Sequence, residues 1–177
     1  GAEVIEKFQA ITGIEERRYA HSSQVASDLG TEASKEALAS SGVDPETLDG
    51  IIVAHNFGDM TISGRQVDIL PSLATRVKHQ LKIKNPNCIA FDILYGCPGW
   101  LQGLIVAYTY IKAGQGNKYL VIGTETLSRT LDPHDRDSMI FADGAGACVV
   151  EAREENVTTS GVLSTASQTF TEEDLGR

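Results

Sequence analysis

Short apolar runs alternate with longer segments of helical periodicity along most of the chain. The runs are evenly hydrophobic rather than alternating, which is typical of strands buried on both faces of a parallel sheet. No helical segment separates the last two runs, so we expect an antiparallel pair to finish the sheet. The expected strands are 51–54, 88–94, 119–123, 145–151 and 157–165, and the expected helices are 2–10, 24–40, 70–81 and 98–113. This order predicts an α/β fold with a mostly parallel sheet, helices on both faces and right-handed crossovers.

Local signals suggest where these elements begin and end. Ser22 or Ser23 is a candidate cap for the helix 24–40, and Gly42 stops it. The stretch 55–67 has no clear period, and a loop that long inside a compact domain is more often functional than accidental.

Composition narrows the class of protein. The 177 residues are 41% hydrophobic and 22% charged, which fits one globular domain, and the net charge is −9. An acidic chain argues against nucleic acid or an anionic membrane as the main partner. We find no signal peptide and no apolar run of the ~20 residues that span a bilayer. Three cysteines without a CxxC motif fit a reducing compartment, so we expect a cytoplasmic protein.

The junction between the strand 88–94 and the next helix is the most informative part of the sequence. Its residues are Tyr95-Gly96-Cys97-Pro98-Gly99. Proline suits the first position of a helix, so Cys97 is expected at the N-cap, in a tight turn that the flanking glycines permit. Such a turn resembles a nucleophile elbow, and the helix N-terminus stabilises thiolate over thiol. We therefore expect Cys97 to be a nucleophile. Cys88 and Cys148 lie in apolar strand patterns, and we interpret them as small buried packing residues.

Two further polar stretches carry weaker signals. Asp132-Pro133-His134-Asp135-Arg136-Asp137 is interpreted as a turn rather than a metal site, and Arg136 is a plausible phosphate ligand. Phe141-Ala142-Asp143-Gly144-Ala145-Gly146-Ala147 precedes a strand, so we expect its small residues to permit tight backbone packing, not dinucleotide binding. The spacing of His21, His55, His79 and His134 selects none of them as a base for Cys97.

Taken together, these residues resemble the 3-oxoacyl-[acyl-carrier-protein] synthase III family, the initiating ketosynthases of the thiolase fold. The resemblance rests on four stretches, which follow one another in the family's order and cover nearly the whole chain. They are Thr12-Gly13-Ile14-Glu15-Glu16-Arg17-Arg18, Phe91-Asp92-Ile93 leading to Cys97, Asp132 to Arg136, and Phe141 to Ala147. It implies that 1–177 is an N-terminal thiolase-like domain, from which the family's first strand and C-terminal half are absent.

The resemblance also implies roles. Cys97 would accept an acyl group from a primer thioester, with its own N–H in the oxyanion hole, and malonyl-acyl carrier protein would then condense with that group and lose CO2. Arg136 would pack on the adenine of coenzyme A, Leu70 would line the partner's acyl pocket across a homodimer, and Met139, Ile140 and Phe141 would bind substrate. No cofactor or metal is expected beyond the acyl-coenzyme A or acyl-carrier-protein thioesters.

Three departures limit what this resemblance implies. The family's catalytic His and Asn lie in the half that is absent, so this piece alone is expected to be inactive. Members of the family usually carry a Trp and an Arg that hold coenzyme A shortly before the Thr-Gly-Ile motif. This chain has Lys7 and Ile11 at those places, so it lacks these two contacts to coenzyme A. The family's Ala-Ala-Cys-Ala-Gly is replaced around Cys97, and Leu70 stands where a larger aromatic is common, which suggests a roomier acyl channel.

Two other functions stay open at this point. One is a cysteine-dependent thioester hydrolase in which one of the histidines is the base. The other is a non-catalytic thiolase-like module that binds acyl carriers or dimerises.

Overall fold

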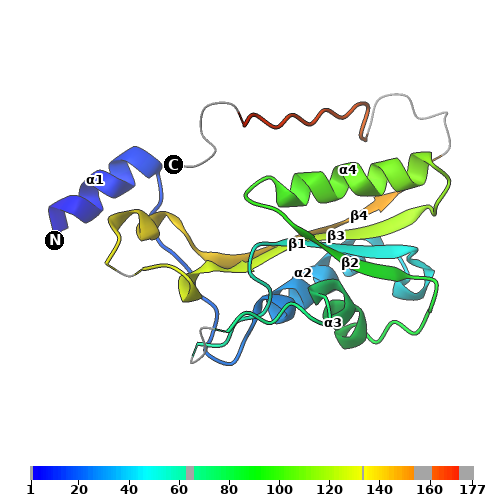
Figure 1. Cartoon of the computed structure of the whole chain (residues 1–177), viewed down its shortest axis with the longest axis horizontal. Coiled ribbons are helices and arrows are strands. Elements are labelled where there is room, and N and C mark those ends of the chain that lie inside the picture. Colours follow the sequence, from blue (N-terminus) through cyan, green and yellow to red (C-terminus); the bar gives the residue numbers. More distant parts are fainter. Residues whose placement is uncertain (1, 63–65, 133, 154–160, 172–177) are drawn as a thin grey trace.

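The computed structural model describes residues 2–62, 66–132, 134–153 and 161–171. Four strands form one mixed sheet in the order β2-β1-β3-β4 (Figure 1). The central strand β1 (Gly50–His55) is parallel to β2 (Ile89–Leu94) and to β3 (Lys118–Thr126), whereas β4 (Asp143–Glu151) runs antiparallel to β3. The α/β class is therefore confirmed. The sheet does end in an antiparallel pair, but the expected pairing of 145–151 with 157–165 is wrong, because β4 pairs with β3.

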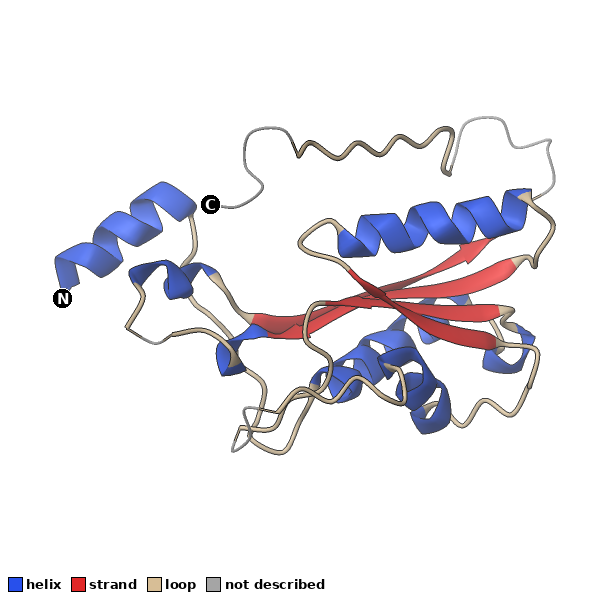
Figure 2. Ribbon diagram, viewed as in Figure 1, coloured by secondary structure: helices blue, strands red, loops and turns tan. Residues whose placement is uncertain are grey.

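Helices cover both faces of the sheet. Figure 2 shows α2 (Ala26–Ser41) and α3 (Leu73–Gln80) on one face and α4 (Gly99–Lys112) on the other, while α1 (Ala2–Thr12) extends beyond the end of the sheet. Short 3-10 helices occur at Pro45–Thr47, Leu127–Arg129 and Arg136–Ile140. None of the helices in the described ranges has the length and hydropathy that crossing a membrane requires.

Each face of the sheet has its own apolar core. Ile52 of β1 is paired with Phe91 of β2 and Val121 of β3, and these side chains pack together on the α4 side. Gly103 lets α4 approach closely, because a Cβ there would lie 2.8 Å from Val121 Cγ1. The core on the other face, against α2 and α3, includes Ile51, Val53, Leu73, Val77, Leu120 and Ile122. Burial on both sides explains why β1 is apolar without alternation.

The beginnings of α2 and α3 differ from the sequence prediction. Neither Ser22 nor Ser23 caps α2; its N-cap is Val25, whose N–H donates to the Asp28 carboxylate at 2.9 Å. The helix α3 was expected from residue 70 but begins after Ser72, whose Oγ accepts the Thr75 N–H. Leu70 stays outside it because a residue before a proline is disfavoured in helical conformation.

The predicted strand 157–165 is not confirmed. Residues 157–160 lie outside the described residues, and 161–165 form no strand. Residues 161–171 instead run without regular structure beside α4, where Ser167 Oγ donates to Gln102 Oε1 at 3.3 Å (Figure 1). The apolar residues of this segment satisfied the local strand pattern, but the sheet edge at β4 does not pair with them.

Candidate active site

The turn between β2 and α4 exposes a cysteine beyond the carboxyl end of the sheet. The N–H of Tyr95 still donates to the His55 carbonyl, and the Gly99 N–H then closes a tight turn on the Gly96 carbonyl at 2.8 Å. Cys97 lies inside that turn and is exposed to solvent. The strand-turn-helix geometry expected for the nucleophile is therefore present.

One detail of that prediction is wrong. Pro98, not Cys97, is the N-cap of α4, and Gly99 is the first helical residue. The Gly96 carbonyl is already engaged in the turn, so the regular helix begins with the bond from Gln102 N–H to the Pro98 carbonyl at 2.9 Å. Cys97 thus sits one residue ahead of the cap, still at the positive end of the helix dipole.

Cys97 opens onto a shallow pocket of about 330 Å³. The carboxyl ends of β1 and β3, the beginning of β4 and the turn around Cys97 form its walls. A ligand is commonly bound beyond the carboxyl ends of parallel strands, because loops from several strands converge there. The thiol therefore lies where a small substrate could reach it.

The glycines of β4 keep this pocket open. A Cβ added at Gly144 or Gly146 would meet no atom within 4 Å, and both residues line the pocket. The expectation that the small residues of 141–147 serve tight backbone packing is therefore wrong for these two positions. Their lack of a side chain leaves space in front of the sheet on the side of Cys97.

Glu125 is a pocket residue that the sequence reasoning missed. It lies near the end of β3, and one of its carboxylate oxygens accepts both the backbone N–H and the side-chain amide of Asn56, at 2.7 and 2.8 Å. The polar end of an otherwise apolar strand was the available signal.

Both ring nitrogens of His55 are committed to hydrogen bonds, although this residue also borders the pocket. Its Nδ1 accepts the N–H of Gly58 at 2.9 Å, so its Nε2 carries the proton and donates to Asp92 Oδ2 at 2.9 Å. The ring is buried. His55 is consequently a structural link between β1, β2 and the following loop, with no nitrogen left to deprotonate Cys97.

The other three histidines lie away from the Cys97 pocket. His21 bonds to Ser23 Oγ, and His134 contacts Asp132 Oδ1 in an exposed loop. His79 is exposed at the end of α3, in a separate groove between α2 and α3. The described part of the chain thus offers no histidine base at the pocket.

The remaining cysteines are shielded. Cys88 is 1% exposed and Cys148 is half-buried in β4. Burial raises the pKa of both thiols above the ordinary value, because a thiolate is poorly solvated there. This agrees with their interpretation as packing residues.

Two aspartates of the acidic stretch bond to the backbone two residues further along the chain. Asp132 Oδ1 accepts the N–H of His134, and Asp135 Oδ1 accepts the N–H of Asp137, each at 2.9 Å. These are side-chain-to-backbone bonds of the kind that aspartate makes in loops. Among the described residues, no group of three or more His, Cys, Asp or Glu side chains could hold a metal ion.

Comparisons with known proteins identify the fold and its family. A family profile described as 3-oxoacyl-[acyl-carrier-protein (ACP)] synthase III matches residues 91–169. The chain is 43% identical over 157 residues to a beta-ketoacyl-[acyl-carrier-protein] synthase III of Vibrio vulnificus, covering 88% of this chain and 45% of that protein. The beta-ketoacyl-[acyl-carrier-protein] synthase III of Caldanaerobacter subterraneus is 46% identical to this chain over 140 residues, which is 78% of this chain and 39% of that protein.

The solved structures agree with the sequences. The crystal structure of 3-oxoacyl-[acyl-carrier-protein] synthase III from Aquifex aeolicus superposes with a TM-score of 0.71 at 38% identity, covering 84% of this chain and 46% of that one. The chain belongs to the synthase III family. It spans about half the length of the curated relatives that it matches, and the matching part is their N-terminal portion.

Two of the stretches that pointed to the synthase III family lie side by side in the structure. The Asp143 N–H donates to the Arg18 carbonyl at 3.0 Å, and Asp143 Oδ2 accepts the N–H of Ala20 at 2.8 Å. Arg17 Nε donates to the Ile140 carbonyl at 3.0 Å. The region of Thr12 to Arg18 therefore supports the segment that leads into β4.

The residues predicted to bind substrate do not all gather at Cys97. Phe141 lines the pocket, whereas Arg136, Leu70, Met139 and Ile140 are not among its lining residues. The side chain of Arg136 is 80% exposed, and its Nε lies 3.8 Å from Asp137 Oδ1. Leu70 is 79% exposed in the loop before α3. In this chain Arg136 and Leu70 are thus free to meet a ligand or a second protein surface.

Proposed function

We propose that this chain is the N-terminal, nucleophile-bearing half of an initiating ketosynthase III, in which Cys97 carries the acyl group during decarboxylative condensation. Residues 1–177 would form one thiolase-like domain. The partners would be a primer acyl thioester and malonyl-acyl carrier protein, and no cofactor or metal takes part.

One observation carries the proposal. The exposed thiol of Cys97 stands in a tight turn between a buried parallel strand and a helix N-terminus, and it opens onto a pocket. A thiolate needs a positive environment and access to substrate, and this position supplies both. The relatives at about 40% identity carry the name of an enzyme that forms β-ketoacyl groups.

The chemistry follows from covalent catalysis. The thiolate of Cys97 attacks the carbonyl carbon of the primer, the C–S bond to the carrier breaks, and the carrier leaves as a thiolate, which takes up the proton that Cys97 released on ionising. Malonyl-acyl carrier protein then loses CO2, its carbanion attacks the acyl carbon, and the Cys97 sulfur leaves as thiolate. Splitting the condensation in this way replaces one difficult step by two easier ones.

A complete turnover would need groups from outside this chain. The only histidine that borders the pocket, His55, has both ring nitrogens engaged. We therefore assign the His and Asn of the decarboxylation step to the remaining half of the protein, and expect this half alone to be inactive. The same observation gives no support to a hydrolase that uses one of the chain's own histidines as base.

The exposed residues would serve substrate and partner. Arg136 would hold the coenzyme A moiety of a primer, with Met139, Ile140 and Phe141 next to it. The strand β2 is an edge of the sheet, and its Ile89 and Leu94 are exposed, which suits pairing with a second copy in a homodimer. Leu70 would then reach the partner's acyl pocket.

Mass spectrometry of the complete protein tests this proposal. After incubation with an acyl thioester, we expect one acyl group on the peptide that contains Cys97, and none in Cys97→Ser. Cys88→Ser is the matched control and should still be acylated at Cys97. Acylation of a different cysteine, or none at all, would overturn the assignment.

A further inference from the structure

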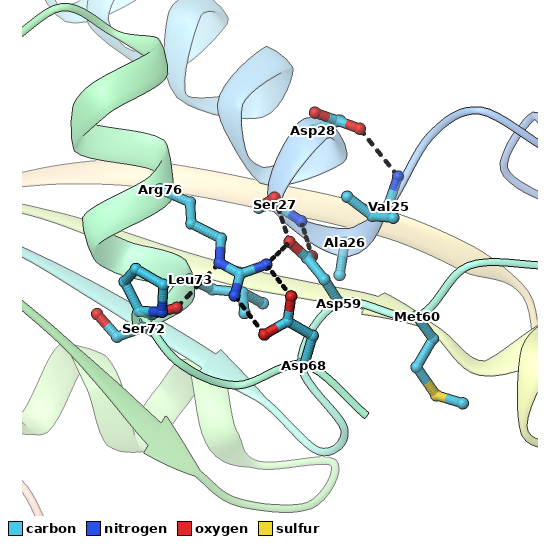
Figure 3. Close-up of polar contacts among 12 residues, drawn as sticks. Val25, Ala26, Ser27, Asp28, Asp59, Met60, Asp68, Ser72, Leu73 and Arg76 are labelled. Carbon is cyan, nitrogen blue, oxygen red and sulfur yellow. Dashed lines mark hydrogen bonds and ion pairs between the residues drawn. The ribbon is translucent and has the colours of Figure 1, made fainter. Parts of the chain in front are cut away.

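A buried carboxylate links the loop after β1 to the beginning of α2. Asp59 is 5% exposed, and its two oxygens accept the backbone N–H of Ser27 at 2.8 Å and the Ser27 hydroxyl at 2.7 Å (Figure 3). A buried charge is costly unless it is paired and hydrogen-bonded. The first turn of α2 offers N–H groups and the positive end of the helix dipole, which partly meets this cost.

Arg76 of α3 completes the pairing and extends it to the loop. Its Nη1 donates to Asp59 Oδ2 at 2.8 Å and to Asp68 Oδ2 at 3.1 Å, and its Nη2 donates to Asp68 Oδ1 at 2.7 Å (Figure 3). Its Nε donates to the Pro71 carbonyl at 2.9 Å. One guanidinium therefore holds three points of the loop. We call Arg76, Asp59 and Asp68 the arginine clasp.

The backbone of the same loop is closed on itself beside the arginine clasp. Asp59 and Asp68 exchange both backbone hydrogen bonds, at 2.9 and 3.0 Å. Gly58 makes this approach possible: it has a positive φ of 73°, and a Cβ there would lie 2.6 Å from the Asp68 carbonyl oxygen. The two ends of the loop are thus held together.

Leu70 lies between two fixed points. Asp68 and Pro71 on either side of it are held by Arg76, and the next turn is held by Asp92, which accepts the N–H groups of Leu73 and Ala74 at 2.7 and 2.8 Å. Leu70 itself is 79% exposed. An exposed apolar side chain is suited to enter a pocket on another surface. Because its segment is already held rigidly, little conformational entropy is lost when it does so.

We propose that Arg76 is a positioning residue that, by holding the 66–71 segment, fixes how far Leu70 enters the partner's acyl pocket and so sets the acyl-chain preference of the partner's Cys97. This inference rests on the proposed function, which places Leu70 in the partner's acyl pocket. The fork of arginine is required, because a lysine has no planar set of donors for a carboxylate and a carbonyl together.

The test uses the complete protein and compares Arg76→Ala and Arg76→Lys with Lys35→Ala. Lys35 forms an exposed ion pair with Glu32 on α2, so its loss removes a cation without touching the loop. For each variant, kcat/KM of Cys97 acylation is measured with acetyl and octanoyl thioesters. We expect Arg76→Ala to raise the octanoyl-to-acetyl ratio about tenfold, Arg76→Lys to give an intermediate ratio, and Lys35→Ala to leave it unchanged.

A merely structural role for Arg76 would lower both rates together, and an unchanged ratio would overturn the proposal. Hydrogen exchange supplies a readout that is independent of acylation: the amides of Asp59 and Asp68 should exchange faster in Arg76→Ala than in Lys35→Ala. Unchanged exchange would overturn the arginine clasp itself. If the unsubstituted protein shows no acylation of Cys97, the proposed function fails, and with it the selectivity role, whereas exchange still decides whether Arg76 holds the loop.

Discussion

His55 Nε2 donates to Asp92 Oδ2 at 2.9 Å, which joins the end of β1 to the middle of β2. The same carboxylate accepts the first two N–H groups of α3. A strand residue therefore caps a helix, fixes a histidine tautomer and supports the loop beside the Cys97 pocket. Replacing Asp92 should therefore weaken the cap of α3, the orientation of His55 and the support of the loop.

We expect Asp92→Asn to lower the free energy of unfolding by about 2–4 kcal/mol, because hydrogen bonds to a charged, mostly buried acceptor are replaced by weaker ones. Urea denaturation followed by circular dichroism measures the loss. Asp44→Asn is the control, since Asp44 caps an exposed 3-10 helix and Asn serves there almost as well. Equal stabilities of Asp92→Asn and the unsubstituted protein would show that these contacts contribute little.

The sequence indicated the Cys97 site because its signals are local. A buried strand, a glycine, the cysteine, a proline and a helix follow one another within a few residues, and each has a known structural preference. The other walls of the pocket, such as Glu125 and Gly146, come from β3 and β4, and only folding brings them to Cys97.

The cap of α2 was mispredicted because some of the contacts that hold the beginnings of helices in this fold are distant in sequence. The first turn of α2 is held by Asp59, which lies 32 residues further along the chain, and that of α3 by Asp92. Capping rules look only at neighbouring residues and therefore favoured Ser22 and Ser23. The strands, in contrast, were found reliably where burial on both faces leaves an evenly apolar run, as in 51–54.

The three cysteines should differ sharply toward an alkylating agent. Iodoacetamide at pH 8 is expected to modify Cys97 first, because it is exposed, whereas burial shields Cys88 and Cys148 and raises their thiol pKa values. Peptide mass spectrometry at increasing reaction times gives the order of modification. Faster labelling of Cys88 than of Cys97 would contradict the described exposure.

Two classes of glycine should respond differently to alanine. Gly103→Ala places a Cβ 2.8 Å from Val121 beneath α4, so we expect a loss of about 1–3 kcal/mol in the free energy of unfolding. Gly146→Ala adds a Cβ in open space within a strand and should change it by less than about 0.5 kcal/mol. Thermal and urea unfolding of the two variants provide the comparison, and a larger loss for Gly146→Ala would show that β4 is packed more tightly than described.

The arginine clasp should weaken in acid. The hydrogen bond from Arg76 lowers the pKa of Asp68 below the ordinary value and outweighs the opposite effect of burial. Because the folded pKa lies below the unfolded value of about 3.9, the stabilisation is complete above that pH and disappears as the pH falls through the folded value. Asp59 shares Arg76 Nη1 and also faces the guanidinium, so the comparison is made with Asp68→Asn, which removes only the exposed carboxylate. We expect this variant to be slightly less stable than the unsubstituted protein at pH 7, and we expect the difference to shrink as the pH falls below about 3.9. A stability difference that does not shrink in acid would show that ionised Asp68 is not its source.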